Sequence, residues 1–210
     1  KEAYGYLRGI KIKGNTKGEA VATMDPVVGP FTDIELELIQ TAINNSYAKN
    51  EIKTDDYILI WLFMIYGSRP IQFAQMKIKD VIFAKRNDSS YEVFLNIPRA
   101  KNRKGARSEF KKRIVPNSFS DLIFNYTEEI KNKFKDIFPN VSEAPLFFNN
   151  TSISYNEDNN YLLKYHLTTS QLNSKIENVL NHLKLKSERT NDFMHITPIR
   201  FRRTIGTRAA

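Results

Sequence analysis

The chain has 210 residues, 41% of them hydrophobic, and a formal net charge of +9. This composition supports a folded core and favours a polyanionic partner, either nucleic acid or an acidic membrane surface. The absence of cysteine excludes disulfide bonds and zinc sites built on thiolates. The longest apolar run, Tyr57–Tyr66, is too short to cross a bilayer, which takes about 20 apolar residues.

Residues 1–30 are expected to form a linker or a basic arm. Glycines and prolines interrupt any helical or strand period there. The basic residues of this segment are Arg8, Lys11, Lys13 and Lys17. They permit two interpretations, a solvated linker or an arm along a phosphate backbone, and the composition favours the linker.

A folded domain is expected over residues 31–210, beginning with a helix. Thr32 and Glu35 have the spacing of a capping box, and Phe31 and Leu36 are placed as a hydrophobic staple around it. The face predicted to point inward consists of Ile34, Leu38, Ile39 and Ala42.

A buried helix is predicted over the apolar run Tyr57–Tyr66. Gly67 suits its C-cap because glycine accepts a left-handed backbone without a Cβ clash. Ser68 is placed to cap the next helix, which is expected to end near Lys79. This arrangement puts Arg69 on a tight turn between two packed helices.

A small antiparallel sheet is predicted next. Its strands are Val81–Lys85, Tyr91–Ile97 and Phe110–Val115. The hairpin between the second and third strands is dense in positive charge and contains one acidic residue, Glu109. Its cations are Arg99, Lys101, Arg103, Lys104, Arg107, Lys111, Lys112 and Arg113. A solvated hairpin tip usually mixes the two signs of charge, so this density favours contact with phosphate.

Helices make up the rest of the domain. One is predicted from Asn117 to Phe138, and a second from Thr168 or Thr169 to about Leu183. The last begins at Thr197, where proline follows as the first helical residue. Its cations are Arg200, Arg202, Arg203 and Arg208. The fold class expected is therefore mainly α with a small antiparallel sheet.

Three motifs follow one another: a Gly-Ser-Arg turn between two helices, a lysine-bearing hairpin and an arginine helix that begins with Thr-Pro. In this order they resemble the catalytic domain of the tyrosine recombinases, the phage-integrase family. The matching stretches are Gly67–Val81, Lys101–Pro116 and Ile196–Thr204, and the resemblance covers about residues 31–210.

The resemblance implies DNA strand exchange without a metal or another cofactor. In that family a tyrosine attacks a backbone phosphate, forms a 3′-phosphotyrosine and releases a 5′-hydroxyl. Arg69 and Arg202 would hold the non-bridging oxygens and stabilise the charge of the transition state. Lys101 would protonate the leaving 5′-oxygen as a general acid.

By the same resemblance, further basic residues are expected to contact DNA. These are Arg99, Arg103, Lys104, Arg107, Arg200 and Arg203. The expected partner is double-stranded DNA at a recombination site, with self-association on that DNA in the full-length protein and no membrane contact. A cytoplasmic, nucleoid-associated bacterial protein, such as the integrase of a mobile element, fits this interpretation.

The sequence departs from the family pattern at several positions. Ile199 stands where the family usually has a histidine, Gln72 where it often has an acidic residue, and Arg203 where a second histidine is frequent. None of the ten tyrosines follows the second arginine motif, and the chain stops inside the predicted last helix. We therefore expect a C-terminally truncated fragment that lacks the nucleophile and does not cleave DNA alone. The alternative is a degenerate relative that binds DNA without cutting it.

Other interpretations of the basic charge fit less well. The strands lack the aromatic platform of single-strand RNA readers. The cations lie on a hairpin and a capped helix, not along an amphipathic surface helix. A tyrosine-type topoisomerase would use the same arginine and lysine chemistry, but the small size of the domain favours a recombinase.

Overall fold

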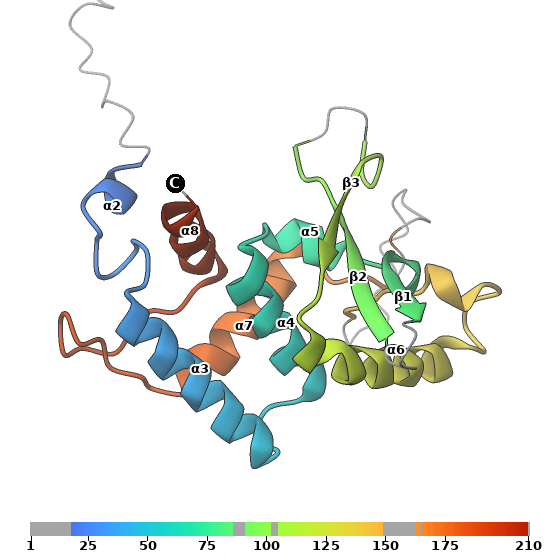
Figure 1. Ribbon diagram of the computed structural model, residues 1–210, viewed down its shortest axis with the longest axis horizontal. Coiled ribbons are helices and arrows are strands. Elements are labelled where there is room, and N and C mark those ends of the chain that lie inside the picture. Colours follow the sequence, from blue (N-terminus) through green and yellow to red (C-terminus); the bar gives the residue numbers. More distant parts are fainter. Residues whose placement is uncertain (1–17, 86–90, 102–104, 149–162, 164, 210) are drawn as a thin grey trace, which may run out of the picture.

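The protein has the mainly helical α+β architecture predicted from its sequence, with one small sheet (Figure 1). The computed structural model describes residues 18–85, 91–101, 105–148, 163 and 165–209. Its helices are α2 (Glu19–Ala22), α3 (Asp33–Ala48), α4 (Thr54–Tyr66), α5 (Pro70–Ala74), α6 (Ser120–Phe134), α7 (Thr169–His182) and α8 (Pro198–Arg208). Short 3-10 turns are η1 (Ile78–Asp80), η2 (Asn117–Phe119) and η3 (Val141–Glu143), and the strands are β1 (Val81–Lys85), β2 (Tyr91–Pro98) and β3 (Phe110–Ile114).

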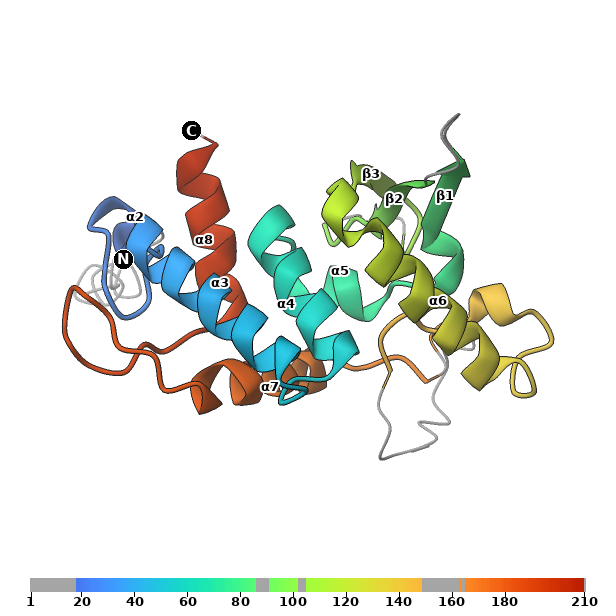
Figure 2. The same cartoon turned by 60° about the horizontal axis from the view of Figure 1, so that its bottom comes forward.

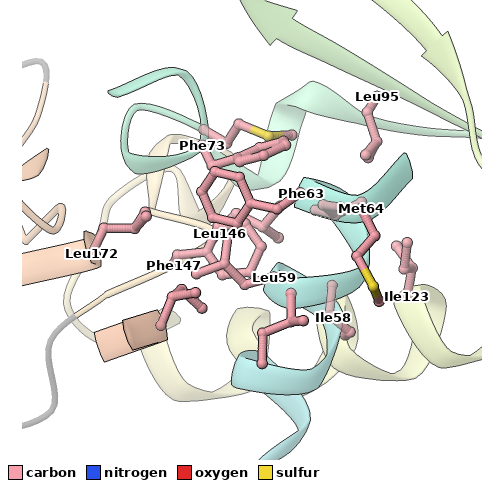
Figure 3. Packing of buried hydrophobic residues seen from close by; sticks show 14 of the residues in the cluster. Ile58, Leu59, Phe63, Met64, Phe73, Leu95, Ile123, Leu146, Phe147 and Leu172 are labelled. Atoms are coloured by element: carbon pink, nitrogen blue, oxygen red, sulfur yellow. The ribbon is translucent and has the colours of Figure 1, made fainter. Parts of the chain in front are cut away.

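Helix α4 lies at the centre of the fold, as its continuous apolar sequence predicts. It contacts α3, α6, α7 and α8. In Figures 1 and 2 it separates α3 and α8 from the sheet and α6. Figure 3 shows Leu59 and Phe63 of α4 close to Phe73, Leu146 and Phe147. The Phe63 and Phe73 rings meet edge to face with centroids 4.8 Å apart, a geometry that ring quadrupoles favour, and this contact packs α5 on α4.

The three strands are antiparallel in the order β1–β2–β3, and all three were predicted within a residue of their ends. Alternation along β2 gives the sheet two faces. Val93, Leu95 and Ile97 are buried on the face that packs against the helices. Phe94 and Asn96 lie on the outer face, where each is only half-buried.

Helix α3 begins with the predicted capping box between Thr32 and Glu35. The predicted inward face is wrong in part, because Ile34 and Leu38 are exposed. The helix is rotated so that Glu35, with Leu36, Ile39 and Ile43, faces the interior. A charged partner for Glu35 explains this rotation, since a buried carboxylate needs a counter-charge.

That partner is a pair of arginines. The guanidinium of Arg189 donates to both carboxylate oxygens of Glu35, at 2.6 and 3.2 Å, and Arg200 of α8 lies 3.7 Å from the same carboxylate. Burial opposes ionisation of Glu35, but hydrogen bonds from Arg189 and Ser187 hold its pKa below the ordinary value. The ion cluster joins α3, α8 and the loop before α8.

The same arginines hold the end of the predicted linker. Arg200 donates to the carbonyl oxygens of Pro26 and Gly29 at 3.0 and 2.9 Å, and Arg189 donates to that of Met24 at 2.7 Å. Residues 24–30 are thus attached to α8 and the loop before it through their backbone, while the side chains of Met24, Val27 and Val28 remain exposed.

The helix after Arg69 is shorter than predicted. It ends at Ala74, and its N-cap is Arg69 itself, not Ser68. The backbone N–H of Lys77 then donates to the buried carboxylate of Asp80 at 2.7 Å, and Lys77 forms a β-bridge with Pro145. These contacts turn the chain away from the helix axis and into β1.

Candidate functional site

Arg69 stands on a turn that Gly67 makes possible. Gly67 ends α4 in the left-handed conformation, with φ 55° and ψ 30°, which glycine adopts without steric cost. The backbone of Arg69 is extended, and its N–H donates to Oε1 of Gln72 at 2.9 Å. The half-buried guanidinium of Arg69 has no hydrogen-bond or ion-pair partner among the described residues.

Helix α8 packs directly on this turn. It starts as predicted, with Thr197 as N-cap and Pro198 as its first residue. A Cβ on Gly67 would lie 3.2 Å from Cα of Arg202 and 3.0 Å from Cβ of Ile205. These contacts are tighter than most Cβ contacts, so a larger residue here would push α8 away by a few tenths of an ångström. The contact brings the middle of α8 onto the turn that carries Arg69.

Two like charges therefore meet at this place. The pKa of Arg202 is lowered, first by partial burial and then by the positive charge of Arg69. No acidic side chain pairs with either guanidinium in the part of the chain that the structure describes. Two cations held together without a counter-ion form a site for an anion, and the planar fork of arginine matches the oxygens of phosphate.

Gln72 connects the Arg69 turn to the lysine hairpin. Its Oε1 accepts the N–H of Arg69, and its Nε2 donates to the carbonyl oxygen of Pro98 at 2.6 Å. Pro98 ends β2, just before Lys101. A carboxylate could accept the first of these bonds but could not donate the second, so the amide joins two backbone segments here.

The hairpin residues predicted to act on DNA are only partly described. Lys101 is exposed at the start of the hairpin turn, with no hydrogen-bond or ion-pair partner among the described residues. Arg99 is exposed and pairs with Glu109 at 3.3 Å. Arg103 and Lys104 lie outside the described residues.

Arg107 does not have the position predicted for a DNA contact. Its side chain is 7% exposed, and it forms two hydrogen bonds with the carboxylate of Asp80, at 2.7 and 2.8 Å. It also donates to the carbonyl oxygen of Gln75. This guanidinium is committed to the base of the hairpin, where it anchors the returning chain beside η1.

Arg200 is likewise an interior residue, although it was predicted to bind DNA. It is 1% exposed, it stacks over the ring of Phe31 at 4.0 Å, and burial lowers its pKa to about 10. Arg203 is half-buried and donates to the carbonyl oxygen of Val28. Both side chains face the docked segment 24–30, on the side of α8 away from Gly67.

The position of the missing family histidine is open and apolar. Ile199 is 52% exposed in the first turn of α8. His195 is exposed, and its carbonyl oxygen accepts a bond from Arg200 at 2.9 Å. Tyr66, close to the turn, donates to the carbonyl oxygen of Ile114 at 2.6 Å, and burial raises its pKa to about 12. A tyrosine in that state is a poor nucleophile.

Membrane-spanning helices and metal-binding clusters are both absent from the described ranges. No helix there is both long and apolar enough to cross a bilayer. No group of three or more histidine, aspartate or glutamate side chains is placed there to hold a metal ion.

The comparisons with known proteins rest on the fold. No protein-family model matches the sequence, and no curated protein matches it. The structure is similar to that of the XerH site-specific recombinase bound to its difH substrate in a pre-cleavage complex. The TM-score is 0.53 at 18% identity, over 87% of this chain. The fold is tyrosine-recombinase-like. The chain spans 43% of the length of that recombinase.

Sequence reasoning missed two acidic residues that shape this recombinase-like fold. Glu35 was recognised only as part of a capping box, and its role as the counter-charge of Arg189 and Arg200 was not predicted. Asp80 was not recognised as the partner of Arg107. The sequence shows Glu35 in a capping box and Asp80 just after a predicted helix. Neither position identifies the partner of the carboxylate.

Proposed function

We propose that the chain is the phosphate-activating part of a tyrosine recombinase, which carries out site-specific DNA recombination or integration through a 3′-phosphotyrosine. The observation that carries this proposal is the pair Arg69 and Arg202, held together without a counter-ion by the contact of Gly67 with α8. The likeness to a recombinase bound to its substrate supports it.

In the proposed reaction, a tyrosine hydroxyl loses its proton to solvent, and its oxygen attacks the phosphorus of a DNA backbone phosphate. The bond from phosphorus to the 5′-oxygen breaks, and the 5′-oxygen takes a proton from the ammonium of Lys101. Arg69 and Arg202 bind the non-bridging oxygens, whose negative charge grows in the transition state. Tyr66, the tyrosine next to the Arg69 turn, is bonded to the carbonyl oxygen of Ile114 and is not proposed as the nucleophile.

The proposal extends to partners and organisation. Three cations of the hairpin would contact the backbone of double-stranded DNA: the exposed Arg99, together with Arg103 and Lys104. Residues 31–210 would be part of a catalytic domain, preceded by the segment 1–30, and the full-length protein would self-associate on its target site.

The test uses the product of the complete natural reading frame and a nicked duplex that carries the candidate recombination site. We expect a covalent protein–DNA adduct on a denaturing gel. The adduct should disappear when one tyrosine that follows Arg202 is changed to phenylalanine. Salt-sensitive binding without any adduct would contradict strand transfer.

A second function has one observation in its favour. Ile199 occupies the position of a histidine that the family uses at the phosphate, and an isoleucine can neither donate a hydrogen bond nor pass a proton. A relative that binds DNA without cutting it would have this residue. In that case, Ile199→His should leave DNA binding unchanged and should still give no covalent adduct.

A further inference from the structure

The charges of β3 are divided between the two faces of the sheet. In the antiparallel register Lys111 lies opposite Ile97 and Arg113 opposite Leu95. Ile97 and Leu95 are buried against the helices, so both cations emerge on that inner side of the sheet. Lys112, between them, emerges on the outer face, where its ammonium lies 3.9 Å from the ring centre of Phe94.

The end of β3 is attached to the last residue of α4, directly before the turn that carries Arg69. β3 is an edge strand, and its end is fixed to α4 by the bond from the hydroxyl of Tyr66 to the carbonyl oxygen of Ile114. The charge of Arg113 acts on Tyr66, whose pKa it lowers against the larger effect of burial. Tyr66 is the last residue of α4, directly before the Gly67 turn. Arg113 therefore lies near the side chain of Tyr66, the residue directly before the turn that carries Arg69.

Both inner cations lack a protein partner. Neither Lys111 nor the half-buried Arg113 has a hydrogen bond or ion pair within the described residues. Glu109 emerges on the same side, but its carboxylate is paired with Arg99. The nearby cations of the hairpin base are neutralised, since Arg107 pairs with Asp80. Uncompensated positive charge is thus concentrated on one edge, next to Arg69.

We propose that Lys111 and Arg113 form a second phosphate-binding subsite. It would bind a backbone phosphate of double-stranded DNA that neighbours the phosphate held by Arg69 and Arg202. This inference rests on the proposed function. A half-buried arginine supplies the planar fork and a lysine supplies a mobile point charge, and together they position the strand without reading its sequence.

The test measures duplex affinity of this chain at several salt concentrations by fluorescence anisotropy. Neutralising Lys111 or Arg113 with glutamine should weaken binding several-fold. Each change should also reduce the slope of log affinity against log salt by about 0.9, the value for one lost phosphate contact. A purely structural role of either side chain would leave that slope unchanged.

Lys112→Gln is the matched control, because it removes the same charge from the same strand on the opposite face. It should change the affinity less than twofold and leave the slope as it is. The inference is overturned if the Arg113 and Lys111 variants behave like the Lys112 variant. If Arg69→Gln still weakens binding in that case, the proposed function is retained without the second subsite. If the unchanged chain does not bind duplex DNA, both the second subsite and the proposed function are contradicted.

Discussion

At the scale of single residues, Gly67 decides how closely α8 can approach α4. Its left-handed φ disfavours any side chain, and an added Cβ would meet the backbone of Arg202. We expect Gly67→Ala to lower the free energy of unfolding by about 1–3 kcal/mol, measured by urea denaturation. We also expect it to weaken DNA binding, since α8 must move.

Gly18→Ala is the control for backbone strain alone. Gly18 also has a positive φ, has no non-neighbouring atom within 4 Å of an added Cβ, and lies outside the hairpin that is proposed to contact DNA. Gly18→Ala should lower stability through backbone strain and leave DNA binding unchanged. Equal effects of the two substitutions on binding would show that the contact of Gly67 with α8 does not position Arg202.

Glu35 is the second residue on which the arrangement depends. Its carboxylate is fully buried between Arg189 and Arg200. Glu35→Gln leaves these guanidinium groups without a counter-charge, so we expect a loss of about 3–5 kcal/mol in the free energy of unfolding. Glu37→Gln, an exposed position on the same helix, should change it by less than about 0.5 kcal/mol.

The pH dependence of this contribution has a defined sign. The folded pKa of Glu35 lies below the ordinary value of 4.5, so its ionised form stabilises the fold. The contribution is complete above 4.5 and is lost as the pH falls through the lower folded value. The stability difference between the unchanged chain and Glu35→Gln should therefore shrink on acidification. A constant difference in urea titrations across this range would contradict the assigned charge state.

At the scale of elements, the hairpin that carries Lys101 is held at its base by the buried Arg107–Asp80 pair. Asp80→Asn breaks that pair and leaves the buried guanidinium of Arg107 uncompensated. We expect a loss of about 3 kcal/mol or more in the free energy of unfolding. Hydrogen exchange of the β2 and β3 amides should also be faster.

Glu109→Gln provides the comparison within the same hairpin. It breaks the exposed pair with Arg99, and exposed pairs contribute at most about 1 kcal/mol. Equal losses in the free energy of unfolding for Asp80→Asn and Glu109→Gln would contradict the role of Arg107 as the anchor of the hairpin. Arg107 could then be free to contact DNA.

The elements themselves were largely predictable from local patterns. The strands were found from their period of two, and α8 and α3 from their capping residues. The end of α5 and the inward face of α3 could not be predicted from local patterns, because both depend on buried charge pairs. The partners of Asp80 and Glu35 are far away in sequence, and one sequence contains no signal for such distant pairs.

At the scale of the whole molecule, the candidate site lies at the end of α4, which contacts α8 and is bonded through Tyr66 to the edge strand β3 (Figure 1). Motif order suggested Arg69 and Arg202, and in the fold the charge of Arg69 acts on Arg202. The same motifs suggested Arg107 and Arg200, which the fold places inside. Composition cannot separate an arginine that binds a ligand from one that holds the chain together, since the difference lies in the partner of each guanidinium.

The most direct test of the central claim is a double-mutant cycle on the rate of adduct formation. It uses the complete natural gene product, Arg69→Gln, Arg202→Gln and the double variant, with a nicked duplex. Each single change should slow adduct formation by roughly 10²–10³-fold. The fold-decrease in rate for the double variant should be far smaller than the product of the two single fold-decreases, because both residues act on one phosphate. Fully multiplicative effects, or a normal rate in either single variant, would contradict a shared phosphate.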